Sequence, residues 1–270
     1  MVIKINRFEF TECWDGVLYK NLSDYPRITD WEIQSLLDFM VYEEMNGRSC
    51  RIEAESSVLE AIERFKQTNK GNKRIAVPPI ITECTACPTY KGCMTEYVCH
   101  TASAENAVKI LDCGSLLSAV KARNMPSSLL KAEARNAAND PEDYFDYVMF
   151  AWGNCQAGDR LVMERKLGRS PTEEELSTGF TPGIIFFFRY DVLTKHPDAI
   201  FDGVLPVKVK DGVNLNEYVH SIIIPTMHKE IIIDHIPDEL RDRVHFLEND
   251  CRDIWEWSEK VYEYIKSSGN

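Results

Sequence analysis

Four cysteines within a short stretch form the clearest set of candidate metal ligands in the chain. Cys84, Cys87, Cys93 and Cys99 follow the pattern C-x2-C-x5-C-x5-C. Four thiolates at such spacing can close a tetrahedral zinc site or hold an iron–sulfur cluster. Because four thiolates leave no open position on the metal, we expect a structural metal and not a catalytic one. The alternative is that all four are free, buried thiols.

A second candidate site is the pair His100–Thr101, which stands where a strand is expected to end and an amphipathic helix to begin. A polar pair at such a junction can line a nucleotide pocket, or the histidine can simply be packed in the core. The chain has no GxGxxG and no GxxxxGKS motif, so the usual phosphate-binding loops are absent. It has no GxSxG and no HExxH motif either. The pair alone leaves both interpretations open.

The elements before the cysteines are expected to form a small α/β unit. Residues 3–10 alternate as a strand does, and Val17–Tyr19 can pair with them. Residues 29–47 and 53–71 are expected helices, each ended by a glycine.

The later part of the chain is expected to be an α+β domain with a largely antiparallel or split sheet, because its strands cluster with few βαβ units. Further helices are predicted at residues 104–111, 118–139, 158–168, 170–177 and 241–268. Strands are predicted at residues 144–152, 183–193, 203–210, 218–225 and 230–237, the second of these as a central strand. In the last helix, the spacing of Trp255, Tyr262 and Ile265 predicts that all three lie in the core.

These patterns divide the chain into three parts. We predict an N-terminal α/β extension over residues 1–80, a Cys-rich connector over residues 81–96 and a larger domain over residues 97–270.

The segment CHTASAENAVKILDCGSLL, which contains the His-Thr pair, resembles the first motif block of the ADP-ribosyltransferase superfamily. In that block a strand ending in His-Gly or His-Thr leads into a helix that ends IL..G.L. Three further blocks follow in the family order: YFDYVMFAWG, GIIFFFRYDVL and NLNEYVHSIIIP. The resemblance covers residues 97–237 and is to the poly(ADP-ribose) polymerase-like branch and the DNA-modifying toxins. It implies a split, mostly antiparallel ADP-ribosyltransferase-like sheet with helical insertions.

The resemblance also implies an activity and a set of roles. In this family NAD+ is cleaved at the nicotinamide ribose through an oxocarbenium-like transition state, which a carboxylate bound to the ribose 2′-hydroxyl stabilises. Glu217 would be that catalytic carboxylate. His100 would hold the adenosine-side ribose, and Thr101 would present backbone groups to the nicotinamide amide. Tyr147 would stack on the nicotinamide ring, with Tyr144 as the second choice.

Two departures from the family pattern affect these roles. The polymerases have glycine where this chain has Thr101, so the backbone approach differs. Aligning HSIIIP with the toxins' E-V-L-V-P puts Ser221, and not Glu217, at the glutamate position. The two residues are four apart, so an unbroken strand would point both to the same face, and the sequence leaves both registers open.

The partners are predicted from the charge and from the basic residues between the family-like blocks. The net charge of −12 excludes a general nucleic-acid binder and favours a protein or small-molecule acceptor over DNA, with RNA left open. The basic residues are Lys121, Arg123, Lys131 and Arg135 in one cluster and Arg160, Arg165, Lys166 and Arg169 in another. They could bind the phosphates of NAD+ or an acceptor, or they could be solvated helix faces.

The expected compartment is the cytoplasm, because the chain has neither an 18-residue apolar stretch nor a signal peptide at residues 1–12. The toxin-like resemblance implies a mono-ADP-ribosyltransferase of toxin or defence character, with an antitoxin as a partner. Two alternatives remain: a catalytically inactive, metal-stapled binding protein on the same scaffold, and an NAD+-dependent RNA 2′-phosphotransferase.

Overall fold

The structure is a computed structural model. It describes residues 2–8, 11–14, 17–45, 49–69, 97–134, 143–153, 155–200 and 207–268. The predicted Cys-rich connector, with Cys84, Cys87 and Cys93, lies outside these ranges. Helices and several separate sheets occur together, so the predicted α+β class is confirmed.

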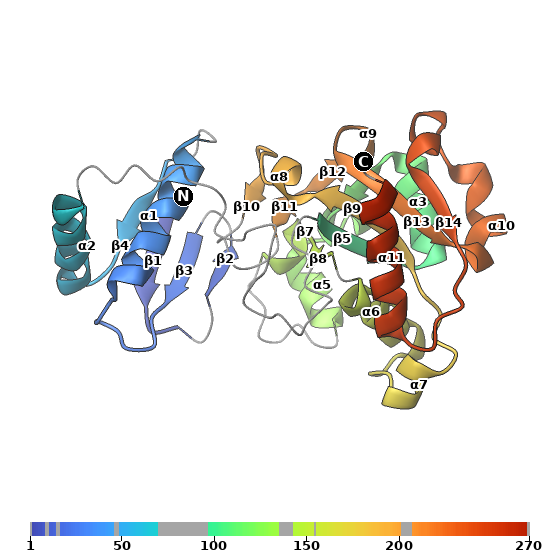
Figure 1. Cartoon of the computed structure of the whole chain (residues 1–270), viewed down its shortest axis with the longest axis horizontal. Coiled ribbons are helices and arrows are strands. Elements are labelled where there is room, and N and C mark those ends of the chain that lie inside the picture. Colours follow the sequence, from blue (N-terminus) through green and yellow to red (C-terminus); the bar gives the residue numbers. More distant parts are fainter. Residues whose placement is uncertain are drawn as a thin grey trace.

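The N-terminal residues form a four-stranded sheet with two helices (Figure 1). The strands are β1 (Val2–Asn6), β2 (Glu12–Trp14), β3 (Val17–Asn21) and β4 (Arg51–Glu53), in the order β2-β3-β1-β4. The helices are α1 (Asp30–Met45) and α2 (Ser56–Thr68). The predicted pairing of the first strand with Val17–Tyr19 is confirmed, and the two strands run parallel.

The remaining described residues form three more sheets and the larger share of the helices (Figure 1). The strands are β5 (Tyr97–Ala102), β6 (Ser115–Leu117), β7 (Tyr147–Met149), β8 (Ala151–Trp152), β9 (Ile184–Arg189), β10 (Ala199–Ile200), β11 (Lys208–Lys210), β12 (Gly212–Asn214), β13 (Val219–Pro225) and β14 (Val244–Leu247). The α-helices are α3 (Ala104–Cys113), α4 (Ala119–Arg123), α5 (Ser127–Glu133), α6 (Gln156–Leu167), α7 (Glu173–Ser177), α8 (Tyr190–Leu193), α9 (Leu215–Tyr218), α10 (Lys229–Ile232) and α11 (Ile254–Ser268). Short 3-10 turns are η1 (Tyr144–Asp146), η2 (Thr226–His228), η3 (Ile233–His235) and η4 (Asp238–Arg243).

The largest sheet has the strand order β14-β13-β9-β5-β8. The most apolar stretch of the chain is its central strand β9, as predicted, and Ile184 to Phe188 are all fully buried. β9 pairs antiparallel with both β5 and β13, whereas β13 and β14 run parallel. Smaller sheets of the orders β10-β11-β7 and β12-β6 lie beside it.

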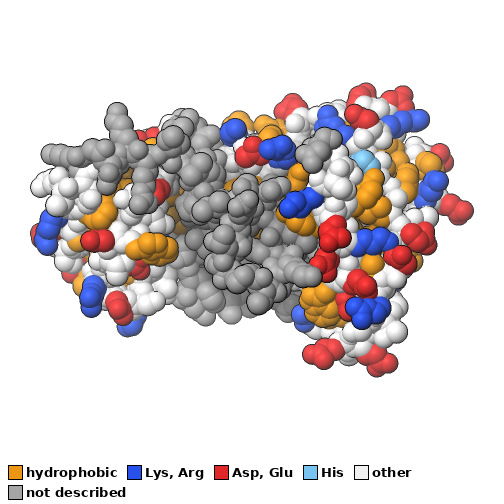
Figure 2. Space-filling view, viewed as in Figure 1, with side chains coloured by type: hydrophobic (Ala, Val, Ile, Leu, Met, Phe, Trp, Pro, Cys, Tyr) orange, Lys and Arg blue, Asp and Glu red, His pale blue; other side chains and the backbone are white. Residues whose placement is uncertain are grey.

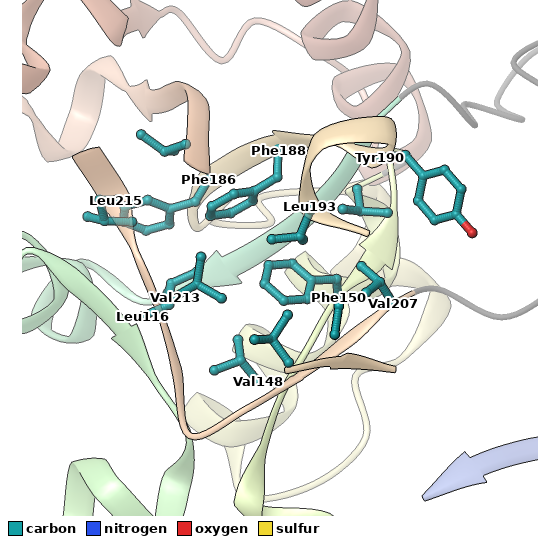
Figure 3. Close-up of a cluster of buried hydrophobic side chains, with 14 of the residues drawn as sticks. Leu116, Val148, Phe150, Phe186, Phe188, Tyr190, Leu193, Val207, Val213 and Leu215 are labelled. Carbon is teal, nitrogen blue, oxygen red and sulfur yellow. The ribbon is translucent and has the colours of Figure 1, made fainter. Parts of the chain in front are cut away.

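The two faces of this five-stranded sheet carry different cores, because successive strand residues point to opposite sides. One face, which we call the intersheet face, carries Val98, Phe186 and Phe188 toward the smaller sheets. Figure 3 shows the aromatic and aliphatic side chains that fill this layer. The other face, the α11 face, carries Cys99 and Phe187 and is covered by α6 and α11.

A β-bulge interrupts β13 and changes the facing of its residues. Val219 pairs with Phe188, but Ser221 pairs with Phe187, so His220 is an extra residue between two consecutive partners. Val219 therefore lies on the intersheet face and Ser221 on the α11 face. Residues 217 and 221 would share a face only on an unbroken strand, and that condition is not met, because Glu217 lies on α9 (Leu215–Tyr218) and the bulge interrupts β13.

The strand predicted over residues 144–152 is also interrupted. Its first residues form the turn η1, and the remainder divides at Phe150 into β7, which pairs with β11, and β8, which pairs with β5. The chain passes from one sheet to another at this point, which a single run of strand-forming residues does not reveal.

The predicted C-terminal helix over residues 241–268 is wrong in its first half. Val244–Leu247 pair with β13 as an edge strand, and α11 begins only at Ile254. The reason is local: the Asp253 carboxylate accepts the N–H groups of the next turn and so fixes the start of the helix. Trp255 was expected in the core, but its side chain is 49% exposed, and Trp257 is fully buried in its place.

The strand predicted over residues 230–237 is a further error, since the chain there forms α10 and η3. Its three consecutive isoleucines favour a strand by propensity, but only Ile232 is buried, while Ile231 is 52% and Ile233 43% exposed. β-propensity largely measures the fit to a packed sheet, and in the described part of the chain no strand pairs with these residues.

This arrangement predicts different effects for neighbouring isoleucines. We expect Ile232→Val to lower the free energy of unfolding by about 0.5–1.5 kcal/mol, because it removes a buried methylene. Ile231→Val is the matched control and should stay within about 0.5 kcal/mol. Urea unfolding of both variants measures the difference, and equal losses would argue against α10.

None of the helices in the described ranges is both long and apolar enough to cross a bilayer.

Candidate functional site

His100 lies near the end of β5, where its ring contacts the point at which the chain changes sheets. Its Nδ1 lies 3.1 Å from the carbonyl oxygen of Met149, and its ring packs against Phe150. A carbonyl oxygen can only accept, so Nδ1 carries the proton. Burial, and to a smaller extent the charge of Arg165, lower the His100 pKa, while the Met149 carbonyl acts in the opposite direction. The ring is therefore neutral near pH 7, and its Nε2 is left as an acceptor.

Thr101 points to the opposite face from His100 and is enclosed by two glycines. A Cβ added to Gly158 on α6 would lie 2.2 Å from Thr101 Oγ1, and one added to Gly183 would lie 2.6 Å from Thr101 Cγ2. Only glycine permits so close an approach at these two positions. The hydroxyl oxygen of Thr101 is buried and has no hydrogen-bond partner.

Asp159 is a buried carboxyl group that the sequence analysis missed. It lies in the first turn of α6 and is fully buried, and its Oδ1 accepts the N–H of Gly183 at 2.7 Å. Its Oδ2 is buried without a partner. Burial raises the Asp159 pKa to about 7, against the opposing hydrogen bonds from Gly183 and Cys155. The sequence does hold a signal for this burial. Asp159 stands four residues before Met163, the other buried residue of α6, so both lie on the same face of the helix.

Cys99, the one predicted metal ligand within the described ranges, is packed in the core of the α11 face. Its thiol donates to the carbonyl oxygen of Trp152 at 3.2 Å, and burial strongly raises its pKa. This packing accounts for Cys99 without a metal. Among the residues that the structure describes, no group of three or more His, Cys, Asp or Glu side chains could hold a metal ion. The four-cysteine site stays a prediction.

Glu217 and Ser221, the two candidates for the catalytic position, lie in different surroundings. Glu217 is exposed on α9, which precedes β13 at the end of the sheet where β5 begins. Ser221 is only 3% exposed and is level with Cys99, since both pair with Phe187. Two strand spacings separate those two, or about 10 Å. Glu217 and His100 are therefore not brought together.

The two tyrosines proposed to stack on nicotinamide differ in accessibility. Tyr147 is 3% exposed and pairs with Lys210 in the three-stranded sheet, so it offers no open ring face. Tyr144 is half-buried in η1, edge to face with Phe145. Of the two, Tyr144 is the more accessible ring.

The extra residue at the bulge in β13, His220, lies beside Ser221 and Tyr97, a grouping that the sequence did not indicate. Ser221 Oγ lies 2.9 Å from Nδ1 of His220, and the His220 ring packs 5.1 Å from that of Tyr97. Burial, followed by the charges of Arg189, His245 and Arg243, lowers the His220 pKa. His220 is therefore neutral near pH 7, in a positive local potential.

Three of the eight basic residues proposed to bind phosphate or an acceptor form ion pairs with acids, and Arg135 lies outside the described residues. Their ion pairs are Lys121–Asp211, Arg123–Glu133 and Arg169–Glu175. Among the coloured side chains on the face seen in Figure 2, basic and acidic side chains are interspersed. Arg165, another of the proposed basic residues, acts on the candidate site itself, because its charge lowers the pKa of His100.

A small cavity of about 170 Å³ opens beside the C-terminal half of α6. Its lining residues are Met163, Lys166, Leu167, Glu175, Thr178, Gly179 and Thr181. None of the residues predicted to bind NAD+ is among them.

Comparison with protein-family models, curated proteins and solved structures found no match to this chain.

Proposed function

We propose that the protein is an NAD+-dependent mono-ADP-ribosyltransferase, which transfers ADP-ribose to a macromolecular acceptor and releases nicotinamide. The observation that carries the proposal is the strand arrangement. Three of the four segments that resemble the family contribute β5, β9 and β13, which are neighbours in one sheet. The remaining segment runs from β7 in the three-stranded sheet to β8 at the edge of the five-stranded sheet and changes sheets at Phe150, beside His100. This change of sheet supports the split sheet that the resemblance implies.

In the proposed reaction, the bond between nicotinamide and the ribose breaks with its electron pair going to nicotinamide. The acceptor then forms a bond to the same ribose carbon and loses a proton. Glu217 would stabilise the positive charge on the ribose. Because Nδ1 of His100 carries the proton, its Nε2 is the nitrogen that can accept from a ribose hydroxyl. The positive charge of Arg165 acts on this ring. The acidic total charge favours a protein acceptor over DNA.

A second candidate is an NAD+-binding protein without turnover. The observation that favours it is where the structure places Glu217 and Ser221, the two residues that could occupy the catalytic position. The residue inside the strand, Ser221, has no carboxylate, and the carboxylate of Glu217 is exposed outside the sheet. Such a protein would bind NAD+ as a ligand and leave it intact.

One experiment separates the two candidates. Purified protein is incubated with labelled NAD+, and nicotinamide release and label on protein, DNA and RNA are scored for the wild type, Glu217→Gln and Ser221→Ala. Release that Glu217→Gln abolishes and Ser221→Ala retains supports the transferase. Full activity of folded Glu217→Gln would reject the role of Glu217.

The binding arm uses the melting temperature, because a ligand that binds only the folded state stabilises it. A rise with NAD+ but no nicotinamide release supports the binding protein. Neither a rise nor release would reject both candidates.

A further inference from the structure

Basic side chains from three neighbouring strands lie near one another at the end of the five-stranded sheet where β5 begins. Arg189 is the last residue of β9 and pairs with Tyr97, the first residue of β5. His220 is the extra residue of the bulge in β13, and its ring centroid lies 5.1 Å from that of Tyr97. Arg243 directly precedes β14, and its Nη1 donates to the carbonyl oxygen of Val219, the residue before His220, at 2.9 Å.

His245 on β14 completes the group. It pairs with Ile223, which lies on the α11 face, so its side chain points to the same face. Its Nδ1 lies 3.1 Å from the hydroxyl oxygen of Tyr264 on α11. Besides burial, the charges of the other three members lower the pKa of His220, so the four groups share one electrostatic field. We call these four residues the basic cluster: Arg189, His220, Arg243 and His245.

Arg243 is the fixed member of the basic cluster. Its Nη1 donates to the carbonyl oxygens of Asn216 at 3.1 Å and Val219 at 2.9 Å, which holds the half-buried guanidinium between α9 and β13. Among the residues that the structure describes, no acidic side chain forms an ion pair with Arg243. A guanidinium has five N–H donors in one plane, so the donors on Nε and Nη2 remain for an oxyanion.

The acidic groups at this end of the sheet lie beside other members of the basic cluster. Arg189 binds Asp191 through Nε at 3.1 Å and through Nη2 at 3.4 Å. Burial lowers the pKa of His245, and the charge of Asp242 acts against that effect. Glu217 is exposed on α9. The charge of Arg243 is therefore the one that a bound anion would balance.

Helix α11 faces the basic cluster with neutral and basic groups. The Tyr262 ring packs edge to face against Tyr97 at 6.4 Å, and the Tyr264 hydroxyl contacts His245. Nζ of Lys266 lies 5.7 Å from the centroid of the Tyr262 ring. These aromatic side chains displace water on one side of the cluster, and a lower local dielectric strengthens the attraction of an anion.

We propose that the basic cluster binds a dianionic oxyanion, the chemistry shared by free phosphate and by a phosphate monoester. Arg243 donates to it through Nε and Nη2. His220 takes up a proton on binding, donates to Ser221 Oγ through Nδ1 and to the anion through Nε2, and His245 adds a second imidazole donor. The site needs neither NAD+ nor Glu217, so it goes beyond the proposed transferase.

The test uses sulfate, because it keeps two negative charges between about pH 5 and pH 8, where histidines titrate. The C2 protons of the six histidines are followed by NMR in sodium sulfate and in sodium chloride of the same ionic strength. The His220 resonance is assigned by its loss in His220→Gln. We expect sulfate to raise the pKa of His220 by at least about half a unit, which corresponds to about threefold tighter binding to the protonated form.

His228 is the internal control, because it follows the opposite end of β13, where its Nε2 lies 3.0 Å from the carbonyl oxygen of Pro182. Its pKa should be the same in both salts. If sulfate moves the pKa of His220 no further than that of His228, or no further than chloride does, the site does not exist.

Arg243→Gln should remove the sulfate-specific shift of His220. Arg241→Gln is the matched control, since Arg241 is an exposed neighbour paired with Asp238, and it should keep the shift. A folded Arg243→Gln protein with the full shift would overturn the site. If Arg243→Gln does not fold, because it loses two bonds to backbone carbonyls, the two salts on the wild type decide alone.

The source of the anion is distinguished by titrating the wild type at constant pH with inorganic phosphate and with adenosine 5′-monophosphate. Binding of the monoester at least tenfold more tightly supports a nucleotide ligand, and equal binding supports free phosphate. If sulfate shifts His220 but neither compound binds, the site holds an adventitious ion only, and the proposal fails. None of these measurements contains NAD+, so the site and the proposed function can fail separately.

Discussion

Asp159→Asn should remove a large pH dependence from the stability of the protein. The folded carboxyl has a pKa of about 7, against an ordinary value of 3.8, so the folded state holds a proton that the unfolded state releases. The free energy of unfolding therefore falls as pH rises from about 4 to about 7. Three pKa units correspond to roughly 4 kcal/mol at most. The asparagine variant keeps an acceptor for Gly183 and carries no charge, so it should be more stable than the wild type at pH 8.

Urea unfolding of both proteins between pH 4.5 and pH 8 measures this effect. The difference between them is the informative quantity, since other groups titrate in the same range. His100 and His220 have lowered pKa values, so their contribution is present above the unfolded pKa and is lost as pH falls. That slope has the opposite sign and is common to both proteins. If the variant and the wild type keep a constant difference across this range, Asp159 is not a buried carboxyl with a raised pKa.

Trp257→Ala should cause the largest loss of stability among single substitutions in α11. The Trp257 side chain is fully buried on the α11 face and packs in one cluster with Ile185 and Phe187. Removing so large a side chain from a core costs about 3–5 kcal/mol, which is a large part of a typical domain's stability. Circular dichroism during urea unfolding measures the loss.

Trp255→Ala is the matched control, because Trp255 lies on the same helix and is 49% exposed. Its effect should stay within about 0.5 kcal/mol. Trp257→Phe should lose less than Trp257→Ala, since it keeps an aromatic ring and removes an indole N–H that has no partner. Similar losses for the two alanine variants would mean that α11 is rotated from the position described.

The sequence could predict those elements whose structure depends on interactions between residues close together in the chain. β9 was predictable because a short run of five isoleucine and phenylalanine residues is typical of a strand buried on both faces. α7 was predictable because Thr172 and Glu175 form a reciprocal capping box. β14 was not, because Val244–Leu247 are a strand only through their pairing with β13. The strand predicted at the isoleucines of α10 failed for the opposite reason, since these strand-forming residues pair with no strand in the part of the chain that the structure describes.

The candidate site likewise has features that the sequence could predict and features that depend on contacts between distant segments. The residue types at His100 and Thr101 were visible in the sequence, but the strand was expected to end there. Because β5 continues to Ala102, the two residues face opposite sides of the sheet. Asp159 was overlooked because an acidic residue in a helix rich in charges is ordinarily exposed. Its burial depends on Gly158 and Gly183, whose close contacts join three segments distant in sequence.

The extra residue in β13 has a consequence for any future alignment of this chain. Because the bulge absorbs one residue, pairing is regular on both sides of His220, and deleting that residue should leave both halves of the strand in their present pairing. A related chain without the bulge would therefore be one residue shorter here and still superimpose. An alignment that closes the gap on the wrong side would exchange His220 with Ser221, or would equate Glu217 with a residue of a different element. The position of that single gap decides which side chain of this strand is compared with a catalytic residue elsewhere.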